Sequence, residues 1–229
     1  HKIALADEKM LPDVALLNTV FLNGLPAKVV ADTGMDVLTH SIEAYVSTNA
    51  NPFSSSFAMK SIKLIFENLV AHYNDRKIQG PKENVQFASC LAGIAFDNSS
   101  LGINHSIAHT VGAKFHIAHG RANAIIMPYV IEVNTEANRK YFEISRELGL
   151  PSDTIEEGKY SLLSFVRILK EKLAVEKSLK DYGVDFETFK REIPSMLEDI
   201  KKDICTQYNP NKLTDEEYVR LLLKIYFGE

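Results

Sequence analysis

The sequence predicts an all-α fold, a bundle of about eight or nine helices. Two features of the 229 residues support this prediction. Apolar residues recur at spacings of three and four along most of the chain, which is the period of one buried helix face. Alternating apolar and polar runs, which would indicate strands, are short and few, and neither a strand–helix–strand pattern nor a GxGxxG motif occurs.

The composition is that of a globular protein with one sizeable core, because 45% of the residues are hydrophobic and 24% are charged. The formal net charge of −4 gives no electrostatic attraction to nucleic acid or to anionic lipid. No run approaches the roughly 20 apolar residues of a membrane-spanning helix. Cys90 and Cys205 lie far apart and form no CxxC motif, which favours a reducing compartment. We therefore expect a cytoplasmic protein without nucleic-acid or membrane partners.

An irregular segment of 24 residues opens the chain, and within it only residues 3–5 and 14–17 could form short extended pieces. Because the sequence starts at His1 without a methionine, we interpret it as part of a longer protein. We expect residues 1–24 to connect a preceding domain to a helical domain at residues 25–229. The first helix of that domain should begin near Thr33, a favourable N-cap residue.

Further helices follow in order. Gly80-Pro81 suits the first turn of one helix, and Thr214 with Glu217 forms a capping box at the start of the last. Pro128 and Pro194 should kink or interrupt the helices that contain them, because proline lacks an N–H donor and clashes with the preceding turn. The apolar stripes that define four of these helices are Ala58, Ile62, Ile65, Phe66, Leu69 and Tyr73; Phe87, Leu91 and Ile94; Leu162, Phe165, Val166, Leu169 and Leu173; and Tyr218, Leu221, Leu222, Ile225 and Tyr226.

Two groups of residues indicate a metal site. Asp36 and His40 are four residues apart, so on a helix they share one face with their Cβ atoms about 5–6 Å apart. His105, His109, His116 and His119 cluster among small and apolar neighbours, where an imidazole needs a partner for each ring nitrogen or a metal ion for one. Each of these histidines alone could be a core residue. The four histidines together with Asp36 and His40 indicate a metal-binding site.

The donor types restrict the metal and the chemistry. Imidazole and carboxylate without thiolate suit Fe²⁺ or Zn²⁺ better than Mg²⁺ or Ca²⁺. His105 and His109 have the spacing of the HExxH zinc-protease motif, but Ser106 replaces the glutamate that would activate water, so we discount a protease. A metal with an open coordination position would act as a Lewis acid on a substrate oxygen.

Two long motifs resemble those of the iron-dependent (group III) alcohol dehydrogenases. The first is ADTGMDVLTHSIEAY at residues 31–45, and the second is GINHSIAH at 102–109, continuing to HGRANA at 119–124. The resemblance covers essentially the whole chain and is strongest at 10–135. It implies the all-helical C-terminal domain of the dehydroquinate synthase-like type, whose N-terminal partner domain binds NAD or NADP and is absent from this sequence.

The resemblance also implies the roles of individual residues. Asp36, His40, His105 and His119 match the four metal-ligand positions, whereas spacing alone would have paired His105 with His109. His109 matches a position beside the nicotinamide cofactor and the substrate, and His116 stays outside the ligand set. The implied reaction interconverts short-chain primary alcohols and aldehydes. The metal acts as a Lewis acid on the alcohol oxygen, the cofactor accepts hydride, and His109 passes the hydroxyl proton to solvent.

Further expectations follow from the resemblance. Members of the family often form dimers or larger homo-oligomers. The 229-residue chain alone should bind Fe²⁺ or Zn²⁺ yet lack dehydrogenase activity, because the cofactor is held mainly by the absent domain. Two other classes remain open on the residues alone, a helical metal hydrolase and a helical interaction module. The hydrolase usually carries an adjacent His-Asp pair, which this sequence lacks, and the module would bind no metal.

Overall fold

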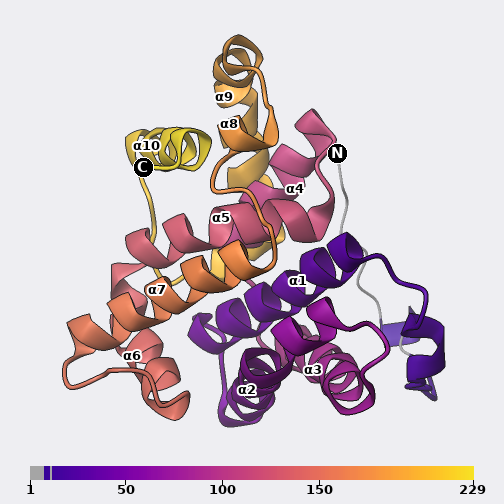
Figure 1. Ribbon diagram of the computed structural model, residues 1–229. Coiled ribbons are helices and arrows are strands. Elements are labelled where there is room, and N and C mark those ends of the chain that lie inside the picture. Colours follow the sequence, from indigo (N-terminus) through magenta and orange to yellow (C-terminus); the bar gives the residue numbers. More distant parts are fainter. Residues whose placement is uncertain (1–7, 11) are drawn as a thin grey trace.

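Helices account for the regular structure of residues 8–10 and 12–229, which are the residues that the computed structural model describes, and no strand occurs among them (Figure 1). This confirms the predicted all-α class. The α-helices are α1 (Ala27–Val46), α2 (Pro52–Asn74), α3 (Gln79–Asp97), α4 (Ile103–Phe115), α5 (His119–Val133), α6 (Asn138–Glu147), α7 (Ile155–Lys172), α8 (Leu179–Tyr182), α9 (Phe186–Lys202) and α10 (Asp215–Phe227). Short 3₁₀ helices are η1 (Glu8–Met10), η2 (Thr19–Leu22), η3 (Thr135–Ala137) and η4 (Ile204–Tyr208).

Helix α5 forms the centre of the molecule. Helices α1, α2 and α3 pack together on one side of it, and α4 lies against α5 and α9 (Figure 1). Every residue of α5 from Gly120 to Ile131 is buried, so this helix is apolar around most of its circumference. Its first residue, His119, therefore has a fixed position relative to α1 and α4.

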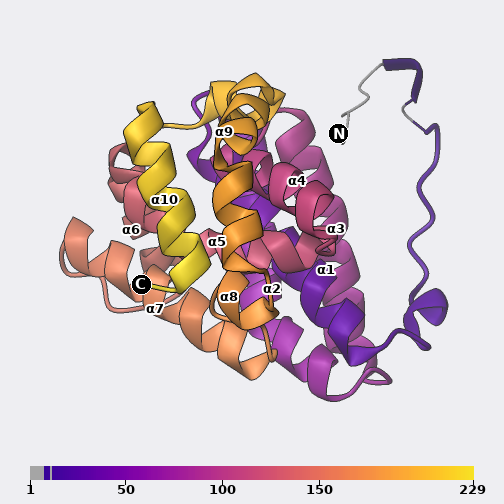
Figure 2. The ribbon, with the colours of Figure 1, turned by 90° about the horizontal axis from the view of Figure 1, so that it is seen from above.

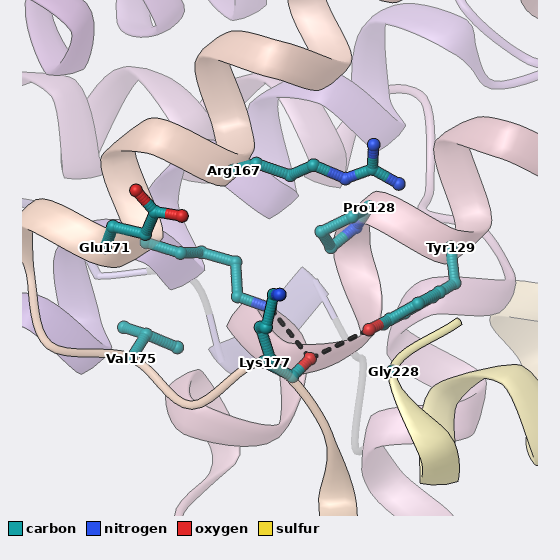
Figure 3. A pocket seen from close by; sticks show the side chains of 8 residues that line it. Pro128, Tyr129, Arg167, Glu171, Val175, Lys177 and Gly228 are labelled. Carbon is teal, nitrogen blue, oxygen red and sulfur yellow. Dashed lines mark hydrogen bonds between the residues drawn. The ribbon is translucent and has the colours of Figure 1, made fainter. Parts of the chain in front are cut away.

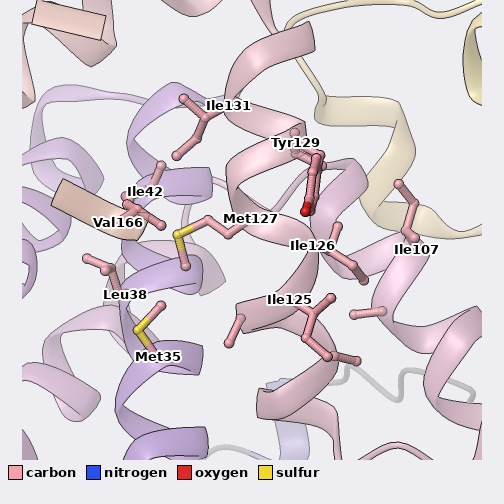
Figure 4. Packing of buried hydrophobic residues seen from close by; sticks show 14 of the residues in the cluster. Met35, Leu38, Ile42, Ile107, Ile125, Ile126, Met127, Tyr129, Ile131 and Val166 are labelled. Atoms are coloured by element: carbon pink, nitrogen blue, oxygen red, sulfur yellow. The ribbon is translucent and has the colours of Figure 1, made fainter. Parts of the chain in front are cut away.

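The hydrophobic core joins α1 to α5. Met35, Leu38 and Ile42 form an apolar stripe on α1, and Ile125 and Met127 of α5 lie in the same cluster (Figure 4). All five residues are at most 2% exposed. Burial of one such side chain stabilises the fold by about 1.5–3 kcal/mol. The same helices that carry Asp36, His40 and His119 are thus held together by tightly buried apolar side chains.

The start of the first helix differs from the prediction. Helix α1 begins at Ala27, after Pro26, and Thr33 lies inside it instead of capping it. The Thr33 hydroxyl donates a hydrogen bond of 2.8 Å to the carbonyl of Val29, four residues earlier, so the threonine is satisfied within a helix. Asp36 consequently lies in the middle of α1, not in its first turn.

The two prolines also differ from the prediction, because α5 continues through Pro128 and α9 through Pro194. In α9, Phe189 lies before Pro194 and Met196 and Ile200 lie after it, and all three are buried, so one continuous helix packs against the core on both sides of the proline. In α5, the Nζ atom of Lys170 donates to the carbonyl of Ile125, in the turn that precedes Pro128. Tertiary burial thus outweighs the local cost of the proline.

The helix starts at Pro81 and Thr214 agree with the prediction. Pro81 lies in the first turn of α3, and Thr214 with Glu217 forms the capping box of α10. Asn51 and Ser54 form a second capping box at α2 that the sequence analysis missed. Of the possible extended pieces, 14–17 forms no strand, and 3–5 lies outside the described residues.

Residues 12–18, which precede η2, run away from the helices (Figure 2). Val14 and Leu16 of this segment are exposed. No helix in the described part of the chain combines the length and apolarity required to cross a bilayer.

Candidate metal centre

Helix α1 presents three acidic or imidazole side chains on one face. The spacings of four and three residues between Asp36, His40 and Glu43 place these side chains next to one another on one face of the helix. His40 and Glu43 lie against α4: the His40 ring is tilted by 32° to the His105 ring with 4.4 Å between their centroids, and Glu43 contacts His105 directly. Phe96 of α3 stacks on the His40 ring with 4.7 Å between the ring centroids.

Two glycines allow α4 and α5 to approach these side chains. A Cβ atom on Gly120 would lie 2.2 Å from the backbone oxygen of Asp32, so only glycine permits this contact between α5 and α1. A Cβ atom on Gly102 would lie 2.7 Å from Oε1 of Glu43. These contacts bring His119 and His105, at the N-terminal ends of α5 and α4, to Asp36.

Asp36, His40, His105 and His119 converge on one point. Each offers one ligand atom, and these atoms all lie within 4.8 Å of one another. The carboxylate of Asp36 is central, with Oδ1 at 3.7 Å from Nε2 of His105 and 3.6 Å from Nε2 of His119, and Oδ2 at 4.0 Å from Nδ1 of His40. A single divalent ion among these atoms could contact all four.

His105 has the surroundings of a metal ligand. Its side chain is 1% exposed, and its Nδ1 lies 2.5 Å from Oε2 of the buried Glu43; the ionised form of Glu43 accepts the proton of that nitrogen. Its Nε2 is buried without a hydrogen-bond partner and points toward Asp36. An orphaned, unprotonated imidazole nitrogen in a buried position is costly unless a cation occupies the space beside it.

The electrostatic environment keeps the imidazoles of His40 and His105 neutral. Burial lowers the pKa of His105 to about 4. Burial, together with repulsion from His105, holds the pKa of His40 well below its usual range. Burial raises the pKa of Glu43 to about 7. The hydrogen bond that the backbone N–H of Asn104 donates to its carboxylate acts in the opposite direction. Neutral imidazole is the form that binds a metal.

Amide side chains position the carboxylate. Nδ2 of Asn123 donates to Oδ1 of Asp36 at 2.7 Å and lies 3.1 Å from Nε2 of His119. Asn104 in turn donates from Nδ2 to Oδ1 of Asn123 at 2.8 Å. Both asparagines are buried. The network holds Asp36 between the two helices that carry the histidines.

His109 lies beside the four-residue cluster and is not part of it. Its ring stacks on His119 with 5.3 Å between centroids and a 14° interplanar angle. Its Nδ1 lies 2.8 Å from Oδ2 of Asp203, the residue that ends α9. Burial alone would raise the pKa of Asp203, but hydrogen bonds from His109 and Cys205 lower it to about 2. The ionised Asp203 therefore orients the His109 ring.

A second group of donors, His109, Asp203 and Cys205, also lies within 4.8 Å. It fits a metal less well. Burial raises the pKa of the Cys205 thiol, and a thiol must lose its proton to bind a metal. His109 already directs its Nδ1 to Asp203. The last clustered histidine, His116, is exposed and ends α4 in a left-handed conformation.

Three residues with clear contacts to this site, Glu43, Asn123 and Asp203, were not predicted from the sequence. Glu43 could have been found from its spacing to Asp36 and His40 on one helix face, and Asn123 from its place four residues after His119. Asp203 gave no signal, because 94 residues separate it from His109.

Comparison with known proteins identifies the family. Residues 30–226 match the model of the C-terminal domain of the Fe-containing alcohol dehydrogenase family. An NADPH-dependent butanol dehydrogenase of Clostridium saccharobutylicum is 41% identical over 99% of this chain and 58% of its own length. An aldehyde-alcohol dehydrogenase of Streptococcus pneumoniae is 37% identical over 100% of this chain and 27% of its own length.

The fold comparison agrees. The structure of an iron-containing alcohol dehydrogenase from Thermococcus thioreducens superimposes with a TM-score of 0.90 at 35% identity, covering 98% of this chain and 57% of that one. The chain therefore spans little more than half the length of two of these proteins and about a quarter of the third. On the match of residues 30–226, this chain belongs to the iron-containing alcohol dehydrogenase family and corresponds to its C-terminal domain.

Proposed function

We propose that this chain is the metal-binding domain of an NAD(P)-dependent alcohol dehydrogenase that interconverts short-chain primary alcohols and aldehydes. One observation carries the proposal: four donor atoms lie within 4.8 Å of one another, and the buried Nε2 of His105 among them has no hydrogen-bond partner. The relative from Clostridium saccharobutylicum, described as an NADPH-dependent butanol dehydrogenase, supports both the substrate class and the cofactor.

Asp36, His40, His105 and His119 would hold Fe²⁺ or Zn²⁺. Three imidazoles and one carboxylate form a donor set suited to either ion. Such an ion supplies Lewis acidity toward the oxygen of an alcohol or aldehyde. Glu43 and Asn123 hold the ligands in place through His105 and Asp36, as hydrogen-bond partners of metal ligands do.

His109 would move the hydroxyl proton. It lies next to the ligand His119, and its side chain is 21% exposed, so it connects the site to solvent. Asp203 holds Nδ1 and leaves Nε2 to accept a proton during alcohol oxidation and to return it during aldehyde reduction. His109 would also contact the nicotinamide cofactor, which a domain outside this chain mainly binds.

The proposal also covers the domain organisation, the localisation and the oligomeric state of the protein. Residues 1–24 would connect the nucleotide-binding domain to the metal-binding domain at 25–229. The protein would be cytoplasmic and form a homo-oligomer, at least a dimer. Isolated from the cofactor domain, the 229-residue chain should show no turnover of ethanol or propanol with NAD.

The activity test uses the longer polypeptide in which a nucleotide-binding domain precedes this chain. We expect reduction of NAD or NADP on addition of butan-1-ol. His109→Gln should lower kcat by about 10²–10⁴-fold, the usual contribution of a general acid or base, with the metal content unchanged. His116→Gln, at the exposed end of α4, is the matched control and should retain full kcat. Equal kcat for the His109 variant and the parent would contradict its role in proton transfer.

A further inference from the structure

A polar cavity lies apart from the histidine cluster. It has a volume of about 390 Å³ and is formed by α5, α7, the segment that follows α7, and the end of α10 (Figure 3). Its lining residues are Pro128, Tyr129, Arg167, Lys170, Glu171, Val175, Lys177 and Gly228, none of which belongs to the proposed metal site. The mechanism above uses none of them.

Lys170 is the buried titratable group of this cavity, with an exposed fraction of 4%. Its Nζ donates to the carbonyl oxygens of Ile125 at 3.2 Å and Lys177 at 3.4 Å. No acidic side chain of the described residues forms an ion pair with it. Two carbonyl acceptors match the two N–H groups of a neutral amine, which then keeps a lone pair.

The surrounding charges act on the pKa of Lys170 in both directions: Glu176 and Asp181 raise it, and Arg167 and Arg121 lower it. Arg167 hydrogen-bonds Glu132, and Arg121 hydrogen-bonds Glu176, so the nearby opposite charges are partly compensated. Burial, the dominant effect, lowers the pKa of Lys170 to about 7. The charged and titratable groups that surround it are Arg121 and Tyr129 on α5, Arg167 and Glu171 on α7, Glu176 and Lys177 in the following segment, and Asp181 on α8.

We propose that Lys170 is a carbonyl-reactive lysine and that its cavity takes short aldehydes, which form a reversible imine with Nζ. The nitrogen lone pair forms a bond to the carbonyl carbon, and the carbonyl oxygen gains the proton that the nitrogen loses. Loss of water from this carbinolamine then forms the C=N bond. A protonated imine keeps one N–H, which can still donate to the carbonyl of Ile125.

The cavity wall suits an alkyl chain near this amine. Pro128, Val175 and the ring of Tyr129 provide apolar surface, while the Tyr129 hydroxyl is already engaged with the carbonyl of Lys177 at 2.9 Å. Alcohol dehydrogenases produce or consume aldehydes, so the reagent belongs to the chemistry of the family. The choice of aldehydes rests on the proposed function, but the inference needs no metal and its test measures no alcohol oxidation, so failure of one is distinguishable from failure of the other.

The test treats the full chain with propanal and cyanoborohydride at pH 7, which converts an imine into a stable propylamine. Peptide mass spectrometry then measures the rate of propylation of each lysine. We expect Lys170 to react at least about tenfold faster than Lys177, an exposed lysine of the same cavity that serves as the matched control. This preference should shrink as the pH is raised to about 10, where exposed amines also lose their protons.

A polymeric aldehyde, oxidised dextran, tests the need for the cavity, because it cannot enter. It should label Lys177 and spare Lys170. Lys170→Met should abolish the propanal-labelled peptide, with circular dichroism as the check on folding, although the main measurement requires no variant. If the propylation rate of each lysine depends only on its solvent exposure, Lys177 will react as fast as Lys170 or faster, and this result would overturn the proposal.

Discussion

At the scale of single residues, the contact with Glu43 controls which ring nitrogen of His105 is available to bind a metal. When Glu43 is ionised, its carboxylate accepts the Nδ1 proton of that imidazole over 2.5 Å, which leaves Nε2 for a metal. We expect Glu43→Gln to weaken Fe²⁺ or Zn²⁺ affinity by about 10–100-fold, the usual effect of losing such a partner. Competition against a chelating dye measures this change.

Glu67→Gln is the matched control for this change, since Glu67 is exposed on α2 and the substitution removes the same charge. The control should bind metal as the parent does. Equal loss in both variants would mean that net charge, and not the contact with His105, controls affinity.

Lys170 predicts a pH dependence of stability. Its pKa is lowered to about 7 in the folded protein, whereas in the unfolded chain it keeps the ordinary value of a lysine, about 10.4. Between these values the unfolded state binds more protons, so this group makes the folded state more stable as the pH rises from about 7 to about 10. Urea denaturation of the parent and of Lys170→Met should show the difference in free energy of unfolding moving in favour of the parent over this range. A constant difference would contradict the prediction.

Some residues of the candidate metal site could be predicted from the sequence. Asp36, His40, His105 and His119 were assigned through motif resemblance, and the structure places them together; whether they bind metal remains a prediction. Spacing alone favoured His105 with His109, because both lie on one face of α4. The choice between His109 and His119 depends on how α5 approaches α1, which no local pattern contains.

At the scale of helices, the contact between α5 and α1 sets the site. Gly120→Ala would place a Cβ atom 2.2 Å from the Asp32 oxygen and force α5 away from α1. We expect a loss of about 1–3 kcal/mol in the free energy of unfolding and weaker metal binding, because His119 moves with α5. Urea denaturation and metal titration measure the two effects.

Gly93→Ala is the control, because nothing lies within 4 Å of the added atom in α3. This change should stabilise the fold by about 1 kcal/mol through helix propensity. Stabilisation by both substitutions would contradict the close approach at Gly120.

Apolar periodicity predicted most helices, but local rules misplaced some of their ends. Thr33 was assigned as an N-cap, yet its hydroxyl bonds to the preceding turn. Pro194 was assigned as a break, yet buried side chains on both sides keep α9 continuous. In both cases tertiary packing overrides a local preference, and the sequence carries no direct record of that packing.

At the scale of the whole molecule, the candidate centre requires three helices distant in sequence. Helix α1 supplies a carboxylate and an imidazole, and α4 and α5 supply one imidazole each. The all-α class could be predicted because helical periodicity is local. The convergence of α1, α4 and α5 could be reached only through resemblance to a family, since it depends on contacts across the core.

The most direct test of the account is the stoichiometry of metal binding. The full chain, freed of metal, is titrated anaerobically with Fe²⁺ and separately with Zn²⁺, beside Asp36→Ala and the exposed control His116→Ala. We predict one tight equivalent per chain for the parent and for the His116 variant, and its loss for the Asp36 variant. Absence of tight binding to the folded parent, or full binding by the Asp36 variant, would contradict the account.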